Sequence, residues 1–113
     1  MASFRASAAI LGSRPGVPPP AVLDAARSGI AAGWLVEDAF VDVEPVVRGA
    51  GAPRVTIRFV VPTANDAEEE ASAWSAARAL AAAVGRVAEW SGLRVFRRCK
   101  GRWVRLDGPE GPA

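Results

Sequence analysis

The sequence predicts an α+β fold in which two helices cover one face of an antiparallel sheet. Residues 66–90 carry apolar side chains at the spacing of one long amphipathic helix. Two stretches between residues 37 and 61 alternate apolar and polar side chains, as the strands of a hairpin do. Each of these elements has a single apolar side, so we expect helix and sheet to bury their apolar sides against each other.

The first third of the chain predicts a strand, a loop and a short helix. Residues 4–11 alternate weakly between apolar and polar side chains, which is typical of a strand. Residues 12–20 contain four prolines and two glycines and therefore predict a loop. Residues 21–32 have a helical apolar stripe, and Gly33 is expected to end this helix.

The middle of the chain predicts a hairpin. Residues 37–47 and 54–61 alternate in phase with a strand, and the glycine-rich residues 48–53 connect them. One side of each strand is apolar and is expected to face the helices. The other side is acidic on the first strand and carries Arg54 and Arg58 on the second, so cross-strand ion pairs are expected there.

The long helix has a recognisable start. Asn65 or Asp66 is expected to cap its N-terminus, with Glu68 or Glu69 as the capping-box partner. Acidic residues in the first turn also suit the positive end of the helix dipole. Gly92 is expected to stop the helix.

The end of the chain predicts two further strands, at residues 93–98 and 102–106. Two registers remain open for this hairpin. A two-residue turn at Lys100-Gly101 would place Arg98 beside Trp103, with both side chains on one face. A three-residue turn that includes Cys99 would shift the pairing by one residue and turn Phe96 into the core.

The predicted order is strand, helix, strand, strand, helix, strand, with one strand added at the end. This order resembles the split βαβ, or ferredoxin-like, topology. Without a strand at residues 4–11, the remaining order would be nearer to KH-like and other small α+β folds. We expect residues 1–107 to form one domain and residues 108–113 to be a disordered tail. Because many unrelated functions share this topology, the topology alone does not indicate a function.

Composition favours a soluble cytoplasmic protein. Half of the 113 residues are hydrophobic, but no stretch reaches the roughly 20 apolar residues of a membrane span or the apolar core of a signal peptide. The single cysteine cannot form an internal disulfide. Residues 1–23 contain arginine and serine but no acidic residue, a composition that overlaps with organelle transit peptides, although a strand and a loop explain the same residues.

The chain contains no histidine and no tyrosine, and no motif predicts a cofactor. Acid–base chemistry would therefore need a strongly shifted carboxylate, lysine or cysteine, which makes an enzyme the less expected class. Asp38, Asp42 and Glu44 share one strand face and form an alternative cation site, but pairing with arginines explains them more simply. Cys99 lies between two basic residues, yet no histidine is present to act as its base.

The C-terminal hairpin is the strongest candidate site. Six of the 14 basic residues follow Ser91, and aromatic residues lie between them. Aromatic rings stack on bases and guanidinium groups hold phosphates, so this pattern is typical of a single-strand nucleic-acid surface. A solvated or ion-paired edge strand explains the same residues. Resemblance to an RNA-recognition motif is poor, because Phe59 is the only aromatic of strand 54–61 and is predicted to point inward. The candidate nucleic-acid contacts are Arg94, Phe96, Arg98, Lys100, Arg102, Trp103 and Arg105.

Two tryptophans indicate a second kind of surface. Trp74 and Trp90 fall at the edges of the apolar stripe of the long helix, where tryptophan either closes the rim of a core or anchors a partner. The leading hypothesis is therefore a small non-enzymatic module that associates with itself or with another protein. Nucleic-acid binding through the hairpin is the second hypothesis. A dimeric α/β-barrel enzyme is the third.

Overall fold

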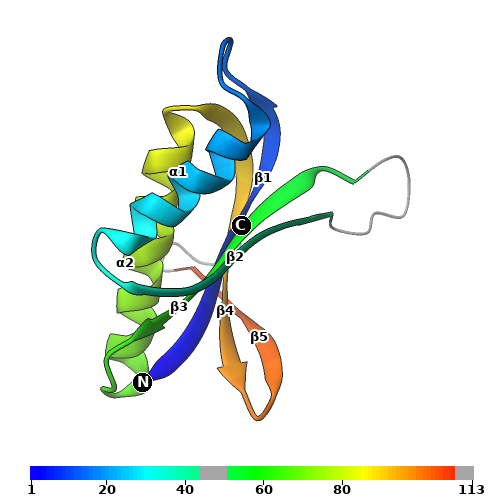
Figure 1. Cartoon of the computed structure of the whole chain (residues 1–113). Coiled ribbons are helices and arrows are strands. Elements are labelled where there is room, and N and C mark those ends of the chain that lie inside the picture. Colours follow the sequence, from blue (N-terminus) through cyan, green and yellow to red (C-terminus); the bar gives the residue numbers. More distant parts are fainter. Residues whose placement is uncertain (44–50, 109–113) are drawn as a thin grey trace.

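The computed structural model describes residues 1–43 and 51–108 of the chain. Two helices lie side by side against one face of a sheet of five antiparallel strands (Figure 1). The predicted α+β arrangement is therefore confirmed. In chain order the elements are β1 (Ala2–Ser13), α1 (Pro19–Ala31), β2 (Leu35–Val43), β3 (Pro53–Val61), α2 (Asp66–Gly85), β4 (Ala88–Cys99) and β5 (Arg102–Leu106).

The first strand forms the centre of the sheet. The strand order is β2-β3-β1-β4-β5, and β1 pairs antiparallel with both β3 and β4. The weak alternation at residues 4–11 therefore does mark a strand, which is longer than predicted at both ends. The KH-like alternative, which lacks this strand, is wrong.

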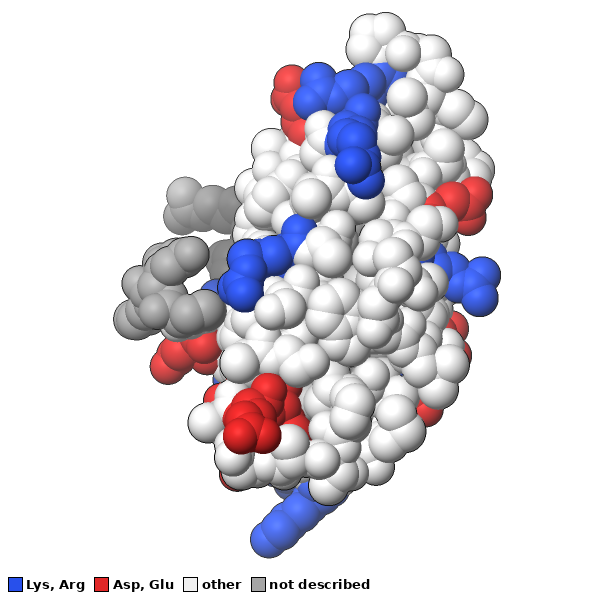
Figure 2. Space-filling view, turned by 90° about the vertical axis from the view of Figure 1, so that its left-hand side faces the viewer, with Lys and Arg blue, Asp and Glu red and all other residues white. Residues whose placement is uncertain are grey.

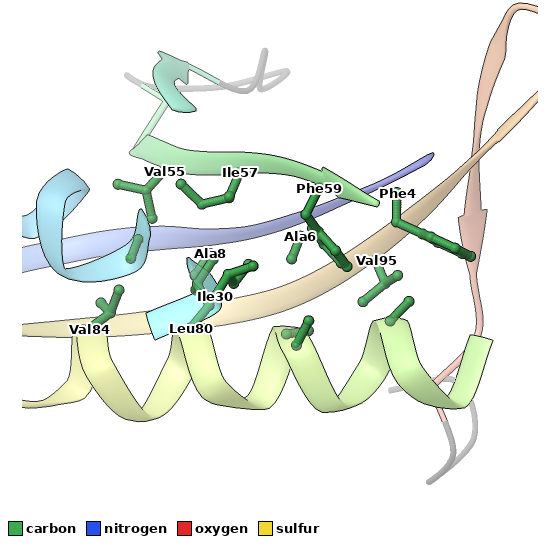
Figure 3. Packing of buried hydrophobic residues seen from close by; sticks show 14 of the residues in the cluster. Phe4, Ala6, Ala8, Ile30, Val55, Ile57, Phe59, Leu80, Val84 and Val95 are labelled. Carbon is green, nitrogen blue, oxygen red and sulfur yellow. The ribbon is translucent and has the colours of Figure 1, made fainter. Parts of the chain in front are cut away.

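The core lies between the sheet and the helices. Three alternate residues of β1, namely Phe4, Ala6 and Ala8, are fully buried and face the helices. Their neighbours come from β3 and the two helices, and the rings of Phe4 and Phe59 stack at a centroid distance of 6.1 Å. Figure 3 shows Leu80 and Ile30 pointing from the helices toward this layer of strand residues. Full burial of side chains of this size contributes about 1.5–3 kcal/mol each.

The helices approach each other closely because their contact consists of small residues. A Cβ atom at Gly29 of α1 would lie 2.8 Å from the carbonyl oxygen of Ala79 and 2.8 Å from the Cβ of Ala83 on α2. Such distances are shorter than van der Waals contact. The small side chains of this contact therefore permit the close approach of the two helices.

The start of α2 agrees with its prediction. The side-chain oxygen of Asn65 accepts a hydrogen bond of 2.9 Å from the backbone N–H of Glu68. The carboxylate of Glu69 accepts one of 3.0 Å from the N–H of Ala64. The cap at Asn65 therefore satisfies one N–H group of the first turn, whereas Glu69 binds the N–H of the residue before the cap and not that of Asn65 itself.

The end of α2 differs from its prediction. The helix stops at Gly85, and the apolar spacing that continues to Trp90 belongs to the beginning of β4. The side chain of Arg14 donates a hydrogen bond of 2.8 Å to the carbonyl oxygen of Gly85, which caps the helix. Trp90 of β4 pairs with Ile10 of β1. Pairing with the central strand therefore overrides the local pattern, which assigns residues 86–90 to the helix. Gly92, with φ of 65°, lies where β4 shifts its register against β1 rather than at a helix end.

Other differences are at the ends of elements. The strand predicted at residues 37–47 begins at Leu35, and its last four residues lie outside the described part of the chain. Pro53, predicted to belong to the connection, is the first residue of β3. Neither helix in the described ranges combines the length and the apolar character that crossing a membrane requires.

One arginine of the C-terminal hairpin, Arg97, lies on the helix side of the sheet and contacts α2. Arg97 forms ion pairs with Glu69, and with Asp66 at 3.4 Å, while its guanidinium lies 5.2 Å from the centroid of the Phe4 ring. The N–H of Ala64 and the hydrogen bond from Arg97 lower the pKa of Glu69. The sequence grouped Arg97 with the other basic residues of the hairpin, but it links β4 to the first turn of α2.

Gly29→Ala should destabilise the fold, since the new methyl group meets backbone and side-chain atoms of α2 that cannot both move away. Overpacking of this kind costs about 1–3 kcal/mol in the free energy of unfolding, which urea denaturation measures. Gly33→Ala is the matched control, because no atom lies within 4 Å of a Cβ at that position. Equal stability of the two variants would contradict the close helix contact.

Acid should weaken the link between Glu69 and Arg97. The lowered pKa of Glu69 means that its carboxylate contributes stability in full above the unfolded value of about 4.3, and that this contribution is lost as the pH falls through the folded value. Glu69→Gln should therefore be less stable than the wild type at pH 7 and lose less stability between about pH 5 and pH 3. Urea denaturation across this pH range measures both effects. Parallel pH curves for the two proteins would refute the assignment.

Candidate functional site

The turn of the C-terminal hairpin decides which side chains share a face. Arg98 pairs with Trp103 and Phe96 with Arg105, so the two-residue turn is confirmed and the three-residue alternative is wrong. Lys100 and Gly101 have φ angles of 49° and 79°. Successive positive φ values are typical of a turn whose twist matches that of the flanking strands.

The face of the sheet opposite the helices carries a groove that crosses all five strands. At a strand spacing of about 4.8 Å, the two outer strands are about 19 Å apart. The groove has a volume of about 390 Å³, which is in the range of ligand-binding pockets. Its lining residues are Arg5, Ser7, Phe40, Asp42, Arg54, Thr56, Arg94, Phe96, Trp103 and Arg105.

The groove is strongly cationic. Four arginines and one carboxylate line it within residues 1–43 and 51–108, and one of the arginines binds the carboxylate. Asp42 accepts hydrogen bonds of 2.9 and 2.8 Å from Arg54, and these bonds are the main cause of the lowered pKa of Asp42. The expected pairing of this acidic strand with arginines is therefore confirmed at Asp42. The alternative cation site has lost one of its ligands to Arg54, and Glu44 lies outside the described residues.

Three guanidinium groups gather around one ring at the edge of the groove. Those of Arg5, Arg98 and Arg58 lie 4.3, 5.2 and 5.4 Å from the ring centroid of Trp103. Burial is the largest cause of the lowered pKa of Arg5, followed by repulsion from Arg58 and Arg98. Arg58 also donates a hydrogen bond of 3.2 Å to Glu37. The positive charges of Arg5 and Arg98 favour the approach of an anion to this end of the groove.

The floor of the groove contains polar atoms without partners. Ser7 and Thr56 face each other across β1 and β3 and expose only 1% and 4% of their surface. Within the part of the chain that the structure describes, neither hydroxyl group has a hydrogen-bond partner, and neither does the Nε of Arg5. An unsatisfied buried polar group costs about 1–3 kcal/mol. A ligand that offers acceptor oxygens at this floor would remove that cost.

The structure brings together part of the predicted nucleic-acid set. Arg94, Phe96, Trp103 and Arg105 line the groove, and Arg98 lies beside it against Trp103. Two predicted residues lie elsewhere: Lys100 is in the turn, and Arg102 alternates with Trp103, which places it with Val104 on the other side of the strand.

Sequence reasoning missed the contributions of the other three strands. Arg5, Ser7, Phe40 and Thr56 were not recognised as site residues, although Arg5 and Ser7 do alternate with the buried residues of β1. That alternation was the available signal. The order of the strands, which brings these residues beside the C-terminal hairpin, is not visible in local pattern.

The two tryptophans predicted for self-association do not form one patch. Trp74 is half-buried, and a Cβ at Gly108 would lie 3.3 Å from its ring, so Gly108 packs here although it was assigned to the tail. Trp90 is half-buried beside Gly85, at the other end of α2, about 16 Å further along the helix axis. The helix side carries scattered charges around a largely uncharged centre (Figure 2). Self-association through these residues stays a prediction.

The edge strand β2 carries apolar side chains that are more exposed than these two tryptophans. Leu35, Val41 and Val43 expose 63%, 53% and 58% of their surface.

Cys99 is half-buried at the end of β4, where it pairs with Arg102.

Comparisons with protein-family models, with curated protein sequences and with solved structures found no match to this chain. The chemistry of the groove is therefore the basis of the functional argument.

The hairpin that supplies one wall of the groove should depend on its turn. Gly101→Val places a β-branched residue at a φ of 79° and should destabilise the protein by about 1–2 kcal/mol. Lys100→Asn, at a φ of 49°, should leave stability unchanged or raise it by about 0.5 kcal/mol, because asparagine tolerates this conformation better than lysine. Thermal denaturation measures both. Destabilisation by Lys100→Asn equal to that by Gly101→Val would refute this turn geometry.

Proposed function

We propose that this protein binds single-stranded nucleic acid across the helix-free face of its sheet. The observation that carries the proposal is the groove itself, in which three aromatic side chains and four arginines share one face. Aromatic rings offer a stacking surface to any base, and guanidinium groups bind phosphates and also stack on bases. The exposed Arg105 and the arginine cluster around Trp103 place positive charge at one end of the groove.

A single strand fits this surface better than a duplex does. Double-stranded DNA is read by a helix or ribbon that protrudes into one of its grooves. Here the aromatic side chains belong to strands of the sheet and line a recess, where only unpaired bases could reach them. The width of the sheet gives room for a few nucleotides laid across the strands.

The fold places every described residue of the groove on a strand of one sheet. We infer a ferredoxin-like topology extended by β5, and the strand order with β1 between β3 and β4 supports this inference. Phe59 is fully buried against Phe4, as its phase predicted, so the aromatic residues of the groove come from other strands than in an RNA-recognition motif. Phe40, Phe96 and Trp103 lie on β2, β4 and β5.

A labelled single strand of mixed sequence tests the proposal. Binding should weaken roughly 50-fold between 50 and 200 mM salt if about four phosphates are contacted. Trp103→Ala should weaken binding by about 1–3 kcal/mol through lost stacking, and Arg105→Ala should weaken it and reduce the salt dependence. Fluorescence anisotropy at several salt concentrations measures these effects.

Arg27→Ala is the control for charge, since Arg27 is exposed on α1, on the opposite side of the sheet. Its affinity and salt dependence should equal those of the wild type. If Arg27→Ala and Arg105→Ala weaken binding equally, the attraction is unspecific and the groove is not the site. If no strand binds while the protein sediments as a salt-insensitive dimer, the self-association hypothesis replaces the proposal.

A further inference from the structure

We propose that the floor of this groove is a subsite for a phosphomonoester, so that the protein prefers single strands that end in a phosphate. The inference deepens the proposed function and rests on it for the remainder of the strand. Its evidence is separate: the arrangement of unsatisfied polar atoms at Ser7, Thr56 and Arg5.

The three unsatisfied atoms lie close together in the sheet. Ser7 and Thr56 are direct partners across β1 and β3, and Arg5 is two residues before Ser7 on the same face of β1. Two hydroxyl groups and one guanidinium N–H therefore belong to one region of the groove, and each can donate a hydrogen bond to a ligand that reaches it. Both hydroxyl-bearing residues are more than nine-tenths buried, which gives these donors fixed positions.

A terminal phosphate matches these donors better than an internal phosphate does. A phosphomonoester presents three strong acceptor oxygens, one for each donor, whereas an internal phosphodiester has only two oxygens outside the chain. A phosphomonoester also carries a charge of about −1.5 to −2 at pH 7, against −1 for a diester. Arg5 and the exposed Arg105 lie on this face among the described residues, and their positive charge favours the doubly charged group.

Other ligand classes fit the floor less well. A divalent cation would need several oxygen ligands, but Asp42 is the one acidic residue of the groove among those the structure describes, and it is bound to Arg54. An apolar ligand would leave both hydroxyl groups and the Arg5 N–H unsatisfied. A strand that ends in a hydroxyl group supplies neither the charge nor the three acceptors.

In the unliganded protein the unsatisfied donors lower the stability of the fold. The melting temperature of the free protein therefore tests the proposal independently of binding. Thr56→Val keeps the shape of the side chain and removes an unsatisfied buried hydroxyl group, so it should raise the melting temperature of the free protein by a few degrees. The same substitution should weaken binding of the terminal phosphate. A residue retained for structure alone would not show this opposition between stability and affinity.

The experiment compares three short strands of one sequence, with a 5′-phosphate, with a 3′-phosphate and with no terminal phosphate. We expect at least one phosphorylated strand to bind roughly 10-fold tighter than the unphosphorylated strand at pH 7.5. The advantage should shrink at pH 5.5, because the second pKa of a phosphomonoester is about 6. It should largely disappear in the double variant Ser7→Ala with Thr56→Val, and persist in the control Ser28→Ala, whose serine is exposed on α1.

The outcomes separate the two proposals. Equal binding of all three strands would overturn the phosphate subsite and leave single-strand binding in place. If no strand binds, the proposed function fails, and inorganic phosphate then tests the subsite alone. A melting temperature that rises with phosphate more than with chloride at equal ionic strength, but not in Thr56→Val, would support the subsite. Equal effects of the two anions would overturn it.

Discussion

The alternation of side chains along β1 is the constraint on which the rest of the structure depends. This strand lies at the centre of the sheet, pairs on both edges and sends Phe4, Ala6 and Ala8 toward the helices. Arg5 and Ser7, the residues between them, form part of the groove on the other face. A slip of one residue in its pairing would exchange the two sets and place a guanidinium in the core. One register therefore fixes both the core and the candidate site.

The two faces of the sheet carry side chains of opposite polarity. On the helix side, small residues such as Gly29 let α1 and α2 lie close together, and the core is apolar apart from the buried Glu69 and its partner Arg97. Among the described residues, one buried nitrogen of Arg97 on the helix side has no hydrogen-bond partner, whereas the open side has three such atoms, at Arg5, Ser7 and Thr56. Natural proteins usually avoid such groups unless a ligand makes use of them. This contrast is the reason for assigning function to the open side.

The sequence predicted the parts of this fold that depend on neighbouring residues. The hairpin register follows from Lys100-Gly101, and the start of α2 follows from Asn65, because turns and caps are local. The end of α2 at Gly85 was missed, since the pairing of β4 with β1 and the cap from Arg14 come from distant parts of the chain. The hairpin half of the groove was predicted for the same local reason. The half supplied by β1, β2 and β3 was not, because strand order is a long-range property.

The position of β5 separates the stability of the fold from the integrity of the groove. This five-residue strand pairs with β4 alone and supplies Trp103 and Arg105. The fully buried residues of the core belong to the other elements, and Leu106 is the residue of β5 that packs against them, so opening of β5 would uncover only the part of the core beside Leu106. A molecule with β5 detached would thus remain folded while lacking one wall of its groove. Amide protons of β5 are expected to exchange earlier than those of β1, and occupancy of the groove would slow that local exchange without a matching change in the core.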